Sequence, residues 1–97
     1  MSKIYKYSIN TDEPIIGNFA KILKVDWQDG ELFLWALIDD LWPEKELIIK
    51  VIPTGVDFTV GTYDQYLDTV QDGFYVWHIF YFLRTVKKDV SKDVINN

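Results

Sequence analysis

The chain contains no cysteine, no long apolar run and no excess of basic residues, and each of these absences excludes a class of protein. Without cysteine no disulfide can hold the fold, which fits a reducing compartment. The longest apolar runs, at 32–38 and 74–83, are well short of the roughly 20 residues of a membrane helix. Because the first ten residues also lack the apolar stretch of a secretory signal, we expect a soluble intracellular protein with no membrane partner.

The shortage of positive charge argues against a nucleic-acid partner. Lysine and arginine number 10 and aspartate and glutamate number 15, which leaves a net charge of −5. Duplex DNA and RNA release their counterions only to a basic surface, so we expect no duplex nucleic acid as a partner. An acidic mimic of DNA is also disfavoured, because lysines interrupt the carboxylates along the chain.

Groups for catalysis and metal binding are equally scarce. His78 is the only histidine, and the three serines, Ser2, Ser8 and Ser91, lie near the chain ends. A catalytic triad needs a nucleophile, a base and an orienting group, and the acidic segment 39–46 lacks the spacing of a calcium loop. We therefore expect no enzyme, no metal site and no cofactor, and we expect His78 to be partly buried and bonded to backbone or to a neighbour.

Aromatic residues are abundant instead, and they lie on segments of alternating character. The 97 residues include 4 Trp, 6 Tyr and 6 Phe, each able to bury roughly 150–250 Å². Alternation between turn residues predicts β-strands. Such segments lie at 3–9, 20–27, 31–39, 47–53 and 74–83, with a weaker one at 58–64. The pattern predicts an all-β fold, a small antiparallel sandwich or partly open barrel of five to seven strands built from Asp-Gly hairpins.

A Gln-Asp-Gly corner at 28–30 predicts the first hairpin, since Asp-Gly favours a type I′ turn. With Asp29 and Gly30 as the loop residues, one side of the ribbon is apolar and the other mixes charge with rings. The apolar side pairs Trp27 with Leu32, Val25 with Leu34, and Leu23 with Ala36. The other side pairs Asp26 with Phe33, Lys24 with Trp35, and Ile22 with Leu37. In this register Lys24 can form a cation–π pair with the Trp35 indole, or its side chain can extend past the ring toward solvent.

The same corner recurs at 71–73, where we expect Asp72 and Gly73 to be the loop residues. This register places Val70 opposite Tyr75 and Asp68 opposite Trp77. The strand that follows is apolar on both of its faces.

We expect a single β domain over residues 1–83 and a polar C-terminal tail over 84–97. In the tail, Val86, Val90 and Val94 have helical spacing, but strong helix formers are few. A short helix and a disordered tail therefore both remain open.

The strands at 31–39 and 74–83 carry rings on both faces, although a sheet needs only one apolar face. Closing the sheet would cover one face, and the tail, a second subunit or a partner would cover the other. We therefore predict a homo-oligomer that uses its remaining rings for binding. The predicted binding residues are Trp35, Trp77, Tyr75, Tyr81 and Lys24.

Three stretches also resemble a family of small tailed-phage proteins described only as a domain of unknown function. They are 34–37 after the first corner, Thr54-Gly55, and 76–80. The likeness runs from about residue 3 to residue 82, but residues 16–19 replace the proline-glycine turn expected before the second strand. The resemblance implies a phage protein in the bacterial host cytoplasm, and it brings no catalytic residues.

Small phage accessory proteins commonly act by binding, so the resemblance implies a non-enzymatic protein that blocks or sequesters a host factor, such as a component of antiviral defence. A second hypothesis is a sponge for a defence signalling nucleotide at a subunit boundary. Its rings would stack on the base, and Lys24, Lys50 or the Thr54-Gly55 turn would meet phosphate. A third hypothesis is a minor virion-associated structural protein.

Overall fold

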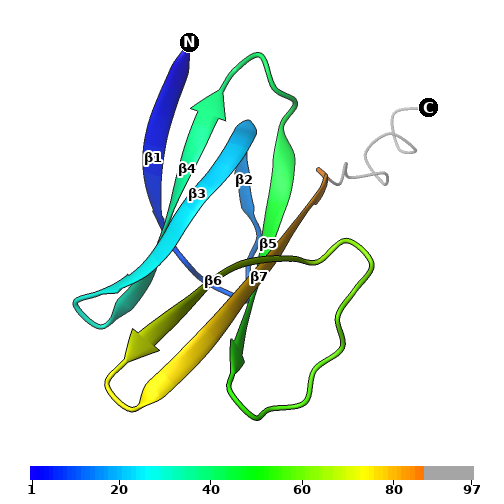
Figure 1. Cartoon of the computed structure of the whole chain (residues 1–97). Coiled ribbons are helices and arrows are strands. Elements are labelled where there is room, and N and C mark those ends of the chain that lie inside the picture. The colour runs from blue at the N-terminus through cyan, green and yellow to red at the C-terminus, as the bar shows by residue number, and fades with distance from the viewer. Residues whose placement is uncertain (87–97) are drawn as a thin grey trace.

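The computed structural model describes residues 1–86, which form seven strands and no helix. The strands are β1 (Ser2–Ser8), β2 (Ile15–Gly17), β3 (Phe19–Gln28), β4 (Glu31–Asp39), β5 (Lys45–Pro53), β6 (Gln65–Asp72) and β7 (Tyr75–Thr85). Sheet A has the order β1-β4-β3 and sheet B the order β2-β5-β7-β6, and all neighbours are antiparallel. The two sheets form an open sandwich and do not close into a barrel (Figure 1). The predicted all-β sandwich is confirmed.

The end of the chain differs from the prediction in one respect. Strand β7 continues past Leu83, the predicted end of the last strand, as far as Thr85. The helix or disorder predicted for the tail falls on residues 87–97, which lie outside the described part of the chain.

The core lies between the sheets and takes one side of each long strand. Its buried members are Phe19, Ile22, Val25, Leu34, Ala36, Leu47, Ile49, Val70 and Ile79. Full burial of such an aliphatic side chain contributes about 1.5–3 kcal/mol. Leu47 and Ile49 face inward on β5.

The first hairpin turns as predicted, but its register contains a bulge. Asp29 and Gly30 have φ of 51° and 82°, the two positive values that a type I′ turn requires. The ladder then slips between Ile22 and Lys24, so that Ile22 and not Leu23 pairs with Ala36. The predicted pairs Leu23–Ala36 and Ile22–Leu37 are therefore wrong.

The bulge has a packing reason. Ile22 and Val25 are three residues apart, so a regular strand of period 2 would point them to opposite faces. An extra residue between them lets both enter the core, where they are 8% and 1% exposed. Leu23 is the residue left over, and it is 40% exposed.

The second hairpin turns one residue later than predicted. Its loop residues are Gly73 and Phe74, so Val70 pairs with Trp77 and not with Tyr75. Of the two loop residues only Gly73 has a positive φ, 57°, which is the pattern of a type II′ turn. The predicted register is wrong by two positions, and a shift of two leaves Asp68 and Val70 on their predicted side. A further register shift between Tyr66 and Asp68 places Tyr66 opposite Phe80, away from the side predicted for it.

The segment 58–64, predicted as a weak strand, is instead part of a long connection over residues 54–64 that we term the covering loop. It leaves the end of β5 and returns across β7 to β6 (Figure 1). Its Phe58 ring lies 5.4 Å from the ring of Phe80. Since Phe80 points away from the sandwich interior, this loop covers the part of the outer face of sheet B around Phe80 and Lys50.

Candidate binding surface

The predicted site residues do not form one surface. Trp35 and Lys24 lie on the outer face of sheet A, opposite each other on β4 and β3. Tyr75, Trp77 and Tyr81 alternate with their neighbours on β7 and share the side of Ile79, which is fully buried. The sandwich interior therefore separates the first group from the second.

The rings of β7 mostly complete the interior. Trp77 and Tyr81 pack against the core, and the Tyr81 hydroxyl donates to Gln65 Oε1 at 3.0 Å. Tyr75 is 64% exposed and stacks on Trp77 with ring centroids 5.9 Å apart. The Trp77 indole N–H is buried and has no hydrogen-bond partner within residues 1–86. Only Tyr75 of this group is freely accessible.

The outer face of sheet A is different, because its rings stand on the central strand with lysines on both flanks. On β4, Leu34 and Ala36 point inward, so the intervening residues point outward. We term this surface the lysine-aromatic face. It consists of Phe33, Trp35 and Leu37 from β4, Lys6 from β1, and Lys21 and Lys24 from β3.

Lys6, and not Lys24, is the cation over the rings. Its Nζ lies 4.1 Å from the Phe33 ring centroid and 5.4 Å from that of Trp35, and it donates to Gln28 Oε1 at 2.9 Å. Lys24 is paired with Trp35 in the ladder, but its Nζ lies 3.4 Å from Asp26 Oδ2. The predicted cation–π pair between Lys24 and Trp35 is therefore replaced by one from Lys6.

The prediction missed Lys6, although the sequence contained a usable signal. The alternation at 3–9 places Lys6 on the side of β1 opposite Tyr5 and Tyr7. That side becomes the outer face once β1 pairs with β4. What the sequence could not supply was the pairing itself, which aligns Lys6 with Trp35.

No strand packs on the lysine-aromatic face within residues 1–86. Its rings are half-buried by their neighbours in the sheet. Ile4 and Leu23 extend the apolar area along the two edges, being 63% and 40% exposed. Although the chain is acidic overall, this face has lysines on both flanks of its rings, so it offers apolar contact together with positive charge.

Catalytic and metal-binding groups are sparse in the described part of the chain. Residues 1–86 contain no cluster of three or more His, Asp or Glu side chains that could hold a metal ion. His78 is partly buried, with Nε2 2.7 Å from Thr54 Oγ1 and Nδ1 3.1 Å from Thr69 Oγ1. It is thus bonded to neighbours, as expected. A search of these residues also finds no helix of the length and apolarity that would cross a membrane.

Comparison with known proteins identifies the family. The chain belongs to the family named domain of unknown function (DUF7352), whose model matches residues 1–88. The match spans all seven strands of both sheets. No curated protein and no solved structure matches the chain. The predicted membership of a domain family of unknown function is confirmed.

Proposed function

We propose that this DUF7352 chain is a non-enzymatic binding protein that holds a protein partner on the lysine-aromatic face. One observation carries the proposal. The rings of this face have no strand packed over them within residues 1–86, whereas the outer face of sheet B is partly covered by the chain's own loop, at Phe80 and Lys50. Aromatic side chains dominate the energy of protein interfaces when a partner excludes water from them.

The geometry suggests how a partner would be held. Trp35 lies at the centre of the face, between Lys6 on one edge strand and Lys24 on the other. An apolar side chain of the partner would cover the indole, and acidic side chains would meet the lysines at the rim. Rim charges of this kind select partners and speed association more than they add affinity.

The resemblance to tailed-phage proteins supplies the biological part of the proposal. We extend the proposal to a phage protein in the bacterial host cytoplasm, where it would block or sequester a host factor such as a component of antiviral defence. A second copy of the chain on the same face would instead give the homo-oligomer expected from the sequence.

The nucleotide-sponge hypothesis finds less support in the geometry. Lys50 is paired with Asp64 at 2.7 Å, and the Thr54 hydroxyl is bonded to His78. Two of the groups assigned to phosphate are thus engaged with other residues. No observation favours the virion-associated role.

The test uses the variant Trp35→Ala. A tagged protein would first recover its partner from bacterial lysate, and calorimetry would then compare the affinities of the parent and variant chains. We expect Trp35→Ala to weaken binding by more than about 2 kcal/mol, the usual loss at an interface hot spot. The matched control is Trp42→Ala, because Trp42 is 51% exposed in the connection between β4 and β5. An unchanged affinity for a folded Trp35→Ala chain would refute the proposal.

A further inference from the structure

Strand β5 has a partly empty edge. On one side it pairs with β7 along its whole length, Lys45–Pro53. On the other side its neighbour is β2, which pairs only with Lys45, Glu46 and Leu47. Within residues 1–86 no strand lies beside residues 48–53 on that edge. Because the Thr54 N–H donates to the Val76 carbonyl, the even-numbered residues of β5 bond to β7, and Ile49, Val51 and Pro53 point toward the position of a missing strand. Ile49 and Val51 each offer an N–H and a C=O there, and Pro53 offers a C=O only.

The ladder stops at Leu47 for a local reason. Ile15 of β2 pairs with Leu47, and the residue before it, Pro14, directly follows a turn. Upstream, a turn diverts the chain, with Asp12 N–H bonded to Asn10 Oδ1 at 2.9 Å and Glu13 N–H to the Asn10 carbonyl at 3.4 Å. The chain therefore leaves the β5 edge at the point where further pairing could begin.

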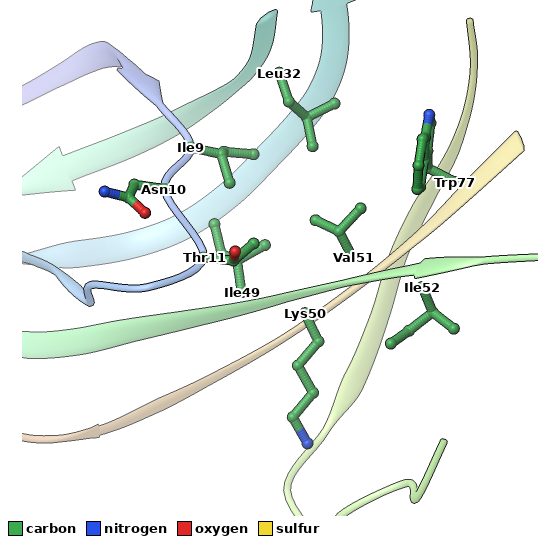
Figure 2. A pocket seen from close by; sticks show the side chains of 9 residues that line it. All are labelled: Ile9, Asn10, Thr11, Leu32, Ile49, Lys50, Val51, Ile52 and Trp77. Carbon is green, nitrogen blue, oxygen red and sulfur yellow. The ribbon is translucent and has the colours of Figure 1, made fainter. Parts of the chain in front are cut away.

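An open groove of about 680 Å³ lies along this edge, where the two sheets part. Figure 2 shows side chains from both sheets around a common space, with Ile9 and Leu32 on the side of sheet A and Val51 and Trp77 on the side of sheet B. Lys50 points to the opposite side of β5 and leaves this space free. The groove thus combines aliphatic and indole side chains with the polar side chains of Asn10 and Thr11 and with an unpaired strand edge.

We propose that β5 binds an extended segment of a partner protein as an added antiparallel strand beside residues 48–53. The segment would lie in line with β2 and continue the ladder that β2 begins. Its backbone would pair with β5, and every second side chain would enter the groove between Leu32, Val51 and Trp77. Strand addition of this kind takes its affinity from main-chain hydrogen bonds and its selectivity from pockets for alternate side chains.

Charge defines the occupant further. An antiparallel segment would run from the Pro53 end toward Leu47, so its C-terminal end would arrive beside Pro14. The exposed residues Asp12 and Glu13 precede Pro14, and the chain has a net charge of −5. We therefore assign the groove to a segment with β-branched or apolar residues at alternate positions and a lysine or arginine at its C-terminal end.

The probe is a synthetic capped peptide that alternates threonine and valine and ends in lysine, titrated into the full chain and followed by nuclear magnetic resonance. We expect the amide signals of residues 48–52 and the Trp77 indole signal to shift. Two N-methylated versions, one on the threonines and one on the valines, provide the backbone test. One version directs its methyl groups at β5 and should bind at least about tenfold more weakly, because it loses several hydrogen bonds. The other should bind like the parent peptide.

Two protein variants test whether the acidic residues beside Pro14 attract the basic end of the peptide. Glu13→Lys should weaken the affinity for the peptide by about threefold, which is the effect of losing one exposed ion pair. Glu31→Lys, at an exposed position on the first hairpin, should leave affinity unchanged. Failure of the peptide to shift the β5 amides, or equal affinity for both N-methylated versions, would overturn the proposal. A dimer in light scattering would also overturn it if the β5 amides of Ile49 and Val51 were protected from hydrogen exchange without peptide. A second copy of the chain would then occupy the edge.

This proposal and the preceding one stand on different surfaces. The Trp35→Ala chain should bind the peptide like the parent chain, so either proposal can fail while the other holds.

Discussion

The outer faces of sheet A and sheet B carry similar rings, but within residues 1–86 a loop of the chain lies over the rings of sheet B and not over those of sheet A. On sheet B the covering loop places Phe58 on Phe80 and brings Asp64 to Lys50. On sheet A, the Lys6 ammonium lies over Phe33 and Trp35, and no strand packs on these rings within residues 1–86. A small domain can therefore hide a ring-bearing face by laying a long connection over it. The face without such a connection is the one where a partner gains most from burial.

The sharpest test of this comparison replaces one phenylalanine on each face. Phe80→Ala should lower the free energy of unfolding by about 2–3 kcal/mol, because the Phe80 ring contacts both Phe58 and Tyr66 and anchors the covering loop. Phe33→Ala should cost about 1 kcal/mol or less, since Lys6 lies over that ring and no strand packs on it within residues 1–86. Urea unfolding of both variants measures the difference.

Equal losses for the two variants would show that the outer face of sheet A is as well packed as that of sheet B. The contrast between a covered and an open face would then be lost. A control at Phe74, which is fully exposed in the second turn, should leave stability nearly unchanged on replacement by alanine.

The covering loop should also make stability depend on pH. Lys50 donates to Asp64, and so does the Gly61 backbone N–H at 2.6 Å, and these bonds hold the pKa of Asp64 below its usual value. A lowered folded-state pKa stabilises the fold above the unfolded value of about 3.9. That stabilisation is lost as the pH falls through the folded-state pKa. Low pH should thus weaken the attachment of the covering loop to sheet B.

The variant Asp64→Asn isolates this effect. We expect it to be less stable than the parent chain at neutral pH and to lose less stability on acidification below pH of about 4, because it has no carboxylate to protonate. Asp57→Asn is the control, since Asp57 is exposed in the same loop. Parallel pH profiles for the parent and Asp64→Asn chains would show that the Lys50–Asp64 pair does not hold the loop.

The sequence was sufficient for the fold class and for one of the two corners. Asp29 and Gly30 both adopt positive φ, so the Asp-Gly rule placed the first turn correctly. At the second corner the rule fails, because a turn that needs only one positive φ is satisfied by Gly73 followed by Phe74. Phenylalanine is not a residue that sequence rules expect in an exposed two-residue turn. The prediction therefore placed the turn one residue too early.

The candidate site was less predictable, because it depends on pairing between distant strands. Trp35 and Trp77 look alike in sequence, yet one lies on an outer face and the other packs on the core. Composition cannot show that residues 54–64 lie over one sheet and leave the other open. The cation over Trp35 likewise comes from Lys6, far away in sequence, since β1 is the edge partner of β4.

The smallest expected effect concerns the Lys6 ammonium on the open face. If it lies over the Phe33 ring in solution, Lys6→Met and Phe33→Leu should be coupled in a double-mutant cycle by about 0.5 kcal/mol, the value of an exposed cation–π pair. The same cycle between Lys24 and Phe33 should show no coupling, because Lys24 is held by Asp26. Coupling from Lys24 in place of Lys6 would mean that the two lysines exchange roles. A partner would then meet an ammonium group from the opposite edge of the face.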